Sequence, residues 1–477
     1  MWPGRHRDAG HDRRGLVTTM EASRHLSRRQ FLWAGMGATL ALGHDAWASH
    51  DGRFVLTEDP RPTPQQLQWQ EAELSMFLHF GMNTFTNREW GLGTEDPRLF
   101  NPTDLDADQW VHVAKEAGFK YLILTAKHHD GFCLWPSRYT DHCVRNSPWR
   151  GGKGDVVGEF AAACRRARVK MGLYVSPWDR HEPSYGTPAY NEHFIQQLTE
   201  LLTGYGEVAE VWFDGANGEG PNGRKQEYDW QGFYRTIRKH QPRALIAIMG
   251  PDIRWVGNED GLAHDTEWSV QPADPVIHGS AHGKVWWPAE CDVSIRPGWF
   301  WHRSEDQQVK SLAHLWDIYT KSVGRNSVLL LNVPPNDRGL LSEPDVHRLH
   351  EFGALIRASF AHDLAQQGKI SFAHPNAAAS DGRERGEWIL KDFPARLELA
   401  LPHPVSFNMV MTQEQIRLGQ HVEEYLVEAR VDGSWRTIAK GTTIGHKKLD
   451  PVERMDADGV SLTVLRSRGD AVIRHIG

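Results

Sequence analysis

The sequence lacks several features that would place it in common classes of protein. Only four cysteines occur in 477 residues and none forms a C-x-x-C pair, so a dense disulfide framework is excluded. Lys and Arg (54) are outnumbered by Asp and Glu (61), and the formal charge of −7 leaves no basic field for nucleic acid. No G-x-G-x-x-G follows the first predicted strand, which removes the usual basis for dinucleotide binding.

The N-terminal region carries an export-like pattern but no membrane span. Ser27-Arg28-Arg29-Gln30-Phe31-Leu32 precedes an apolar run from Trp33 to Gly43, and Ala46-Trp47-Ala48 then offers a small-x-small cleavage site. The run is too short to cross a bilayer permanently. The twin arginine resembles a bacterial Tat signal, so residues 1–48 are predicted to be removed during export to the periplasm or the exterior. A basic, disordered tail with a chance arginine pair is the alternative.

Tryptophan, by contrast, is abundant, with 20 residues in the chain. Trp stacks well on the apolar faces of sugar rings, which favours a protein that binds carbohydrate. Large protein cores also use Trp, so composition alone leaves both interpretations open.

Residues 49–365 are predicted to form a (β/α)8 barrel of the α/β class. Short apolar runs alternate there with segments of helical period, such as Trp110, Val113, Ala114 and Ala117. About eight such units are typical of this barrel, although a doubly wound open sheet would give the same alternation over part of the chain. The predicted strands are Met76 to Phe80, Tyr121 to Thr125, Met171 to Val175, Val208 to Phe213, Leu245 to Met249, a weaker run at Val285 to Ala289, either Val293 to Ile295 or Trp299 to Trp301, and Val328 to Val333.

Residues 366–477 are predicted to form a second domain. After Phe360 the apolar period changes to two, as in Leu397, Leu399 and Leu401, and polar turns separate the runs. This pattern indicates an antiparallel β-sandwich. Such a module either binds glycan or has a structural role, and we favour the structural role.

Polar side chains lie at the ends of four successive predicted strands. His79 is the first, and the stretch Lys127-His128-His129-Asp130-Gly131-Phe132 follows; Tyr174 and Asp214 close the next two strands. Because active sites of barrels lie at the C-terminal strand ends, these groups are expected to share a site. Asp214 is the strongest candidate for a catalytic carboxylate, and the alternative is a helix cap.

Two features leave alternatives open. The adjacent His128 and His129 could bind a sugar, form structural hydrogen bonds or bind a metal. Since neighbours on a strand point to opposite faces, the metal is the least favoured of these. The loop from Arg254 to Asp260 is expected past the fifth strand, where it can reach over the site. Composition does not choose a proton donor there among Glu259, Asp252, Asp260, Asp265 and Glu267.

Four stretches together resemble the α-L-fucosidases of glycoside hydrolase family 29. They span nearly all of residues 65–360 and are His79-Phe80-Gly81, Ala126-Lys127-His128-His129-Asp130-Gly131-Phe132, Trp212-Phe213-Asp214-Gly215 and Leu330-Leu331-Asn332-Val333-Pro334-Pro335. Two further stretches, Asn83 to Gly91 and Arg254 to Glu259, resemble the B-type branch of that family. Members of this branch prefer α-1,3 and α-1,4 fucosyl linkages. The C-terminal segment also looks like theirs.

The resemblance implies roles for individual residues. Asp214 falls on the nucleophile of the family, and Glu259 falls on the acid/base of the B-type branch, a position that varies across the family. The residues that match fucose contacts or groups around the sugar are His79, His128, His129, Tyr174, Trp212, Glu89, Trp90 and Trp299. The resemblance implies no metal and no organic cofactor.

The expected activity is that of a retaining exo-α-L-fucosidase that removes terminal α-1,3/1,4-linked L-fucose. The expected partner is a fucosylated oligosaccharide or glycoprotein glycan, with no nucleic acid and no membrane span; the sequence assigns no oligomeric state. Two alternatives are a fucose-binding, lectin-like barrel without hydrolysis and a metal-dependent barrel hydrolase.

Overall fold

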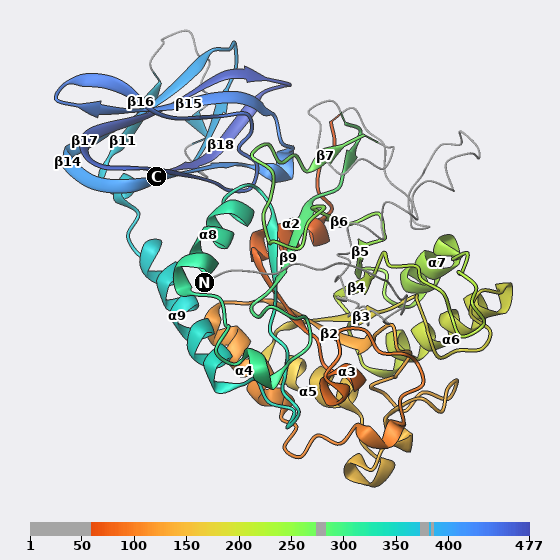
Figure 1. Ribbon diagram of the computed structural model, residues 1–477. Coiled ribbons are helices and arrows are strands. Elements are labelled where there is room, and N and C mark those ends of the chain that lie inside the picture. Colours follow the sequence, from red (N-terminus) through yellow and green to blue (C-terminus); the bar gives the residue numbers. More distant parts are fainter. Residues whose placement is uncertain (1–58, 273–282, 373–380, 383–385) are drawn as a thin grey trace, which may run out of the picture.

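The structure, a computed structural model, describes residues 59–272, 283–372, 381–382 and 386–477 (Figure 1). The predicted export signal, residues 1–48, lies outside this range. Figure 1 shows a barrel with surrounding helices, and a separate group of strands (blue) beyond α8 and α9. Within the described residues, no helix is long and apolar enough to cross a membrane.

The first domain is built on eight parallel strands, in the spatial order β5-β4-β3-β2-β1-β10-β9-β6. The backbone N–H of Ile253, just before β6, donates to Ile246 O in β5 (3.3 Å), so the sheet nearly closes. The predicted barrel is therefore confirmed. Its strands are β1 (Leu74–Leu78), β2 (Tyr121–Lys127), β3 (Lys170–Val175), β4 (Glu210–Phe213), β5 (Leu245–Ile248), β6 (Arg254–Trp255), β9 (Ala289–Ser294) and β10 (Val328–Asn332).

The sixth barrel strand was not where the apolar runs indicated. Val285–Trp286 is β8, which pairs antiparallel with β7 (Val270–Gln271) outside the barrel sheet, so the prediction at Val285 to Ala289 is wrong. The sixth strand is β6, and its two residues are too few to show a period. Of the two alternatives for the next strand, β9 contains most of the first and ends at Ser294, whereas Trp299 to Trp301 lies outside any strand.

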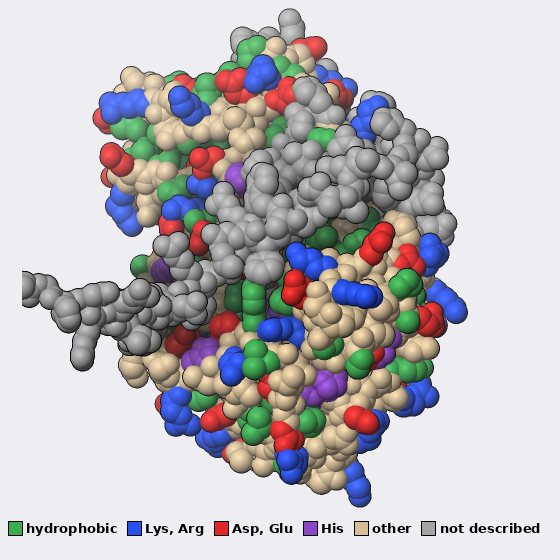
Figure 2. Space-filling view, turned by 45° about the vertical axis from the view of Figure 1, so that its right-hand side comes forward, with side chains coloured by type: hydrophobic (Ala, Val, Ile, Leu, Met, Phe, Trp, Pro, Cys, Tyr) green, Lys and Arg blue, Asp and Glu red, His purple; other side chains and the backbone are tan. Residues whose placement is uncertain are grey.

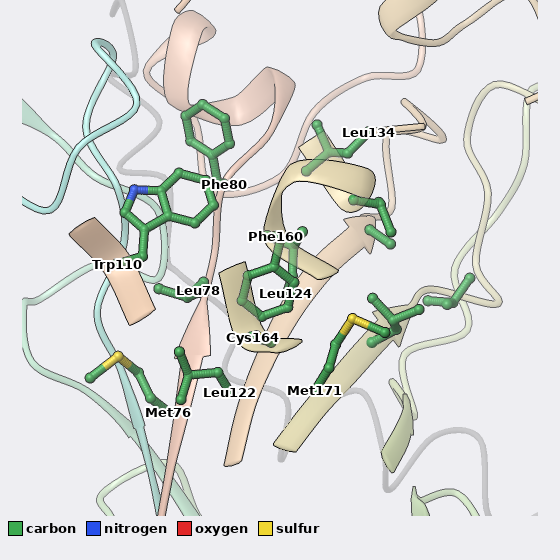
Figure 3. Packing of buried hydrophobic residues seen from close by; sticks show 14 of the residues in the cluster. Met76, Leu78, Phe80, Trp110, Leu122, Leu124, Leu134, Phe160, Cys164 and Met171 are labelled. Atoms are coloured by element: carbon green, nitrogen blue, oxygen red, sulfur yellow. The ribbon is translucent and has the colours of Figure 1, made fainter. Parts of the chain in front are cut away.

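Helices pack around the barrel through the apolar stripes seen in the sequence. Figure 3 shows Trp110 of α4 and Phe160 of α5 against the outward side chains of β1 and β2. Asp106, Asp155 and Asp229 cap helices by accepting backbone N–H groups. The helices are α2 (Pro64–Ala72), α3 (Met82–Thr86), α4 (Ala107–Ala117), α5 (Val156–Ala167), α6 (Pro188–Gly204), α7 (Trp230–His240), α8 (Leu312–Ser322) and α9 (Glu343–Ser359).

The alternation along β4 carries an acidic group to the rim of the barrel. Val211 and Phe213 face the outer helices, where Phe213 meets Phe233 of α7 (ring centroids 6.2 Å apart). Trp212 faces inward and stacks on Tyr174 of β3 (5.3 Å). Since side chains alternate between the faces of a strand, Asp214 also points inward, at the C-terminal mouth of the barrel.

The second domain is antiparallel, and its apolar residues form a core separate from that of the barrel. Leu397, Leu399 and Leu401 are buried there, as their period of two predicts. The predicted fold class is thus confirmed for both parts. The strands are β11 (Lys369–Phe372), β12 (Asp381–Gly382), β13 (Glu387–Leu390), β14 (Ala395–Glu414), β15 (Val422–Val431), β16 (Ser434–Gly441), β17 (Lys448–Ser467) and β18 (Ala471–Ile476).

Acidic and basic side chains are interspersed over the described part of the face shown in Figure 2. The mixture agrees with the small acidic excess in the sequence. Within the described residues, the exposed large hydrophobic side chains are Leu92 and Leu99, both in the region that follows α3.

Candidate active site

The Asp214 carboxylate is buried and held by two hydrogen-bond donors. The Tyr174 hydroxyl donates to Oδ2 (3.0 Å), and the backbone N–H of Ala216 donates to Oδ1 (2.8 Å). Nε2 of His129 lies 3.8 Å from Oδ2. The two donated hydrogen bonds orient the carboxylate and stabilise its negative charge, which is what a nucleophile at this position requires.

Hydrogen bonds fix the tautomers of two histidines near Asp214. Nδ1 of His79 lies 2.8 Å from Oδ1 of Asn332, which can only accept, so Nδ1 carries the proton. The Ser176 hydroxyl donates to the carbonyl oxygen of Trp178 (2.6 Å) and therefore accepts from Nδ1 of His129 (2.7 Å). In the neutral form of each ring, Nε2 is then the acceptor and is suited to a sugar hydroxyl.

The two adjacent histidines lie on the same side of the chain. The rings of His128 and His129 have centroids only 4.1 Å apart, and Nδ1 of His128 contacts the Asn83 amide (3.3 Å). The argument that they point to opposite faces is wrong, because β2 ends at Lys127 and the chain turns at His128, whose carbonyl accepts from Gly131 N (3.0 Å). Within the described residues, no cluster of three or more His, Cys, Asp or Glu is arranged to hold a metal ion.

Aromatic rings surround these polar groups. His79 lies beside Trp299 (ring centroids 5.1 Å apart), and Trp90 meets the edge of His129 (6.0 Å). Beneath them, Trp212 stacks on Tyr174. Aromatic rings beside histidine acceptors suit a pyranose, which has both apolar faces and hydroxyls.

Glu89 holds the loop that carries Trp299. Its carboxylate accepts the backbone N–H of Trp299 (2.7 Å) and that of Phe300 (3.3 Å). Nε2 of His302 lies 2.6 Å from the same carboxylate, which raises the pKa of this imidazole. The resemblance placed Glu89 among the groups around the sugar; here its contacts orient the neighbouring Trp299.

Glu259 follows β6 rather than β5 and faces the same cluster. The indole N–H of Trp299 donates to its Oε2 (3.4 Å), and Trp299 in turn packs on His79. Two of the competing carboxylates are engaged elsewhere: Asp252 pairs with Arg238 of α7 (2.5 Å), and Glu267 pairs with the buried Arg254. Asp265 pairs with Arg325 (2.7 Å) and Asp260 is exposed. Glu259 is thus the member of the set that the tertiary structure joins to the predicted site.

Comparison with known proteins identifies the family. The family model for α-L-fucosidases matches residues 48–359, which is more than half of the chain. The chain belongs to the α-L-fucosidases. The α-L-fucosidase 1 of Arabidopsis thaliana is 44% identical to this fucosidase over 451 residues, covering 88% of this chain and 87% of the plant protein.

Solved structures agree with this fucosidase in sequence and in fold. A member of glycoside hydrolase family 29 from an unknown rumen bacterium is 41% identical, with a TM-score of 0.81 over 88% of this chain and 77% of that one. A family 29 fucosidase of Ruminococcus gnavus in complex with fucose is 34% identical, with a TM-score of 0.80 over 91% and 96% of the two chains. This fucosidase is therefore a glycoside hydrolase of family 29.

The structure of this fucosidase adds residues that the sequence did not single out. Asn332 orients His79, and its amide donates to Ser294 Oγ (2.9 Å) and to Trp299 O (2.8 Å). Trp178 packs on the ring of His129 (4.8 Å) and on that of Trp90 (5.7 Å). Asn332 could have been found from the sequence, because it ends the last barrel strand and lies in one of the stretches that resemble the family.

A pair of buried carboxyl groups lies below the site of this fucosidase. The indole N–H of Trp212 donates to Oε2 of Glu290 in β9 (2.7 Å), and Glu210 of β4 is buried close to Glu290. Burial raises the pKa of Glu210 to about 8, and burial together with the charge of Glu210 raises the pKa of Glu290. Glu290 therefore fixes the Trp212 ring on which Tyr174 stacks.

Replacing Glu210 with Gln is expected to stabilise this fucosidase in alkaline solution. Because the folded pKa of Glu210 is raised, its contribution to stability is full below the ordinary Glu range and is lost as pH rises through about 8. Gln does not ionise, so the variant avoids this loss. We expect Tm to rise by about 2 °C or more at pH 9, with a smaller difference at pH 5, in thermal unfolding followed by circular dichroism. Equal shifts at the two pH values would contradict the assignment.

Proposed function

We propose that this enzyme is a retaining exo-α-L-fucosidase in which Asp214 is the nucleophile and Glu259 is the acid/base. The observation that carries the proposal is the buried Asp214 carboxylate at the mouth of the barrel, held by Tyr174 and Ala216. Glu259 reaches the same cluster through Trp299. Retaining glycoside hydrolysis uses a pair of carboxyl groups, one as nucleophile and one as acid/base.

In the proposed first step, a carboxylate oxygen of Asp214 attacks the anomeric carbon of terminal fucose. Glu259 donates its proton to the glycosidic oxygen as the carbon–oxygen bond breaks, which releases the aglycone and leaves a covalent fucosyl-enzyme. Glu259, now ionised, then takes a proton from the incoming water. Water displaces Asp214, and the two inversions give net retention. Carboxyl groups about 5–5.5 Å apart are the expected arrangement for this chemistry in the substrate complex.

The stereochemistry is tested by NMR during the first minutes of hydrolysis of an aryl α-L-fucoside. We expect α-L-fucose to form first and β-L-fucose to appear only by mutarotation. An initial burst of β-L-fucose would show inversion and would reject the covalent intermediate at Asp214.

We propose that the preferred substrates carry α-1,3- or α-1,4-linked fucose on an oligosaccharide or glycoprotein glycan. The support is the likeness of Asn83 to Gly91 and of Arg254 to Glu259 to the B-type branch. We expect free fucose from α-1,3 and α-1,4 fucosyl trisaccharides and much slower release from an α-1,2 isomer, measured side by side by chromatography. Preference for the α-1,2 isomer would remove the B-type assignment but not the barrel mechanism.

We further propose that the protein is exported by the Tat route and acts in the periplasm or outside the cell. The support is the twin-arginine segment at Ser27 to Leu32 with the apolar run and cleavage pattern behind it. Export that stops when Arg28 and Arg29 are both changed to Lys, measured by cell fractionation, is the expected result.

Activity is expected to survive removal of metal ions. The mechanism uses two carboxyl groups, and histidines whose Nδ1 atoms already contact protein groups, so it needs no Lewis acid. Dialysis against a chelator should leave kcat/KM on an aryl fucoside unchanged, and added Zn²⁺ or Ca²⁺ should not raise it. Inactivation that a divalent metal reverses would favour the metal-dependent hydrolase instead.

A further inference from the structure

A buried ion pair closes the base of the loop that carries Glu259. Arg254 in β6 pairs with Glu267, and both side chains are 2% exposed. Arg254 also donates to Trp287 O (3.1 Å) and to Trp268 O (3.2 Å). Glu259 lies between the two partners in the sequence. The ion pair therefore fixes both ends of the segment that carries Glu259.

The side-chain amide of Gln420 connects the second domain to this ion pair. Gln420 lies between β14 and β15 in the sequence, and its side chain is fully buried. Its Nε2 donates to Glu267 O (3.2 Å) and to Thr443 Oγ1 (2.6 Å). Its Oε1 accepts from Ser269 N (2.8 Å) and from Asn326 Nδ2 (3.2 Å). All four hydrogen-bonding positions of the amide are therefore used, and they join the sandwich to the base of the loop.

Asn326, between α8 and β10, completes the attachment from the barrel side. Its Nδ2 donates to Glu267 O (3.0 Å), and its Oδ1 accepts from the backbone N–H of His446 in the sandwich (2.7 Å). Gly445 fits against this side chain with φ +66°, where a Cβ would lie 2.2 Å from Asn326 Cγ. One side chain from each domain thus donates to the same carbonyl, that of Glu267.

Residues of the barrel contact the far part of the loop. The backbone N–H of Ala263 donates to Lys321 O in α8 (2.9 Å), and Arg325 pairs with Asp265 (2.7 Å). Gly261 packs closely on Val293 of β9. The loop therefore has two attachments, and the one at its base depends on the sandwich.

We propose that the C-terminal sandwich positions the proton donor: Gln420 fixes Glu267, and through it Arg254 and the loop that presents Glu259. The proposal rests on the assignment of Glu259 as acid/base. A general acid contributes only when its proton lies within reach of the leaving oxygen, so a small displacement of the loop lowers the rate. Gln420 is thus a positioning residue that belongs to a different domain from the site it serves.

Gln420→Leu in the full-length enzyme tests this role with two substrates. The first is an α-1,3-linked fucosyl disaccharide, whose sugar leaving group needs protonation. The second is 2-chloro-4-nitrophenyl α-L-fucoside, whose leaving group departs without a proton. We expect kcat/KM to fall about tenfold on the disaccharide and by less than about twofold on the aryl fucoside. Equal losses on both substrates, or no loss on either, would overturn the proposal.

Tyr425→Phe is the matched control, because it removes a buried hydrogen bond inside the sandwich, from the tyrosine hydroxyl to Asp450 (2.9 Å). It should leave the ratio of the two kcat/KM values unchanged.

If Gln420→Leu unfolds below the assay temperature, Thr443→Val removes only the hydroxyl that accepts from Gln420. That variant should show the same difference between the substrates at about two- to threefold, and equal rates on both would again overturn the proposal.

Glu259→Ala on the same two substrates separates the two hypotheses. If this variant loses activity equally on both, the assignment of Glu259 fails. If Glu259→Ala discriminates between the leaving groups and Gln420→Leu does not, the acid/base assignment stands and the role of the sandwich fails.

Discussion

Asp214→Gly should lower kcat on an aryl α-L-fucoside by at least about a thousandfold, because it removes the proposed nucleophile. The carboxylate that accepts from Tyr174 and Ala216 is removed, while the stacked rings beside it remain. KM is expected to change much less than kcat, since the histidines and aromatic side chains that are proposed to bind the sugar are unchanged. Steady-state kinetics at the pH optimum provide the measurement.

Azide rescue identifies the role of the missing carboxylate. Azide fits the space that Gly leaves and attacks the anomeric carbon directly, while the aryl oxide departs with the electrons of the broken bond. We expect azide to restore turnover of Asp214→Gly and to give the inverted β-L-fucosyl azide. Activity close to that of the native enzyme without azide, in a variant with an unchanged melting temperature, would refute the nucleophile assignment.

Glu259→Ala should lower kcat/KM on an α-1,3-linked fucosyl disaccharide by about 10²–10⁴-fold and on 2-chloro-4-nitrophenyl fucoside by far less. The sugar released from the disaccharide leaves as an alkoxide unless its oxygen is protonated, whereas the phenolate is stable in water. The alkaline limb of the pH profile of kcat/KM should also disappear, because that limb reports loss of the proton from the acid.

Azide should act differently on this variant. The covalent intermediate still forms on Asp214, and azide, which needs no general base, then releases it as the α-L-fucosyl azide with retained configuration. The matched control is Asp260→Ala, since Asp260 is the exposed neighbour of Glu259 and its change should leave both substrates unaffected. A β-fucosyl azide from Glu259→Ala, or an equal effect of Asp260→Ala, would contradict the assignment.

The strand-end groups were predictable because a short parallel strand has few ways to place its last residue. Val211 and Phe213 are apolar and face the helices, so Asp214, one position further, had to face the barrel mouth. The same reasoning applies to His79 and Tyr174. Contacts among these residues also follow, since the carboxyl ends of all the barrel strands meet at one face.

Other parts of the site depended on segments without a period. β6 has only two residues, so alternation of apolar residues could not locate it. The turn after Lys127 places the rings of His128 and His129 on the same side, which alternation along a strand does not predict. Glu290 is a charged residue of a type that usually lies on the surface, yet the nearly closed barrel buries it beside Trp212. Which local carboxylate faces the site was open for the same reason: Asp252 pairs with Arg238 of α7 and Glu267 pairs with Arg254 of β6, and no local pattern shows either pair.

The sequence by itself determined the barrel followed by a sandwich, the acidic strand end at Asp214 and the family to which the chain belongs. These features follow from the local spacing of apolar residues and from short stretches of neighbouring residues. Only the tertiary structure decided that Glu259 joins Trp299, that Glu290 holds Trp212, and that Gln420 reaches across a domain boundary to Glu267. Each of these contacts joins residues far apart in the chain, and their meeting depends on how the sheet closes and how the domains pack, which no local pattern records.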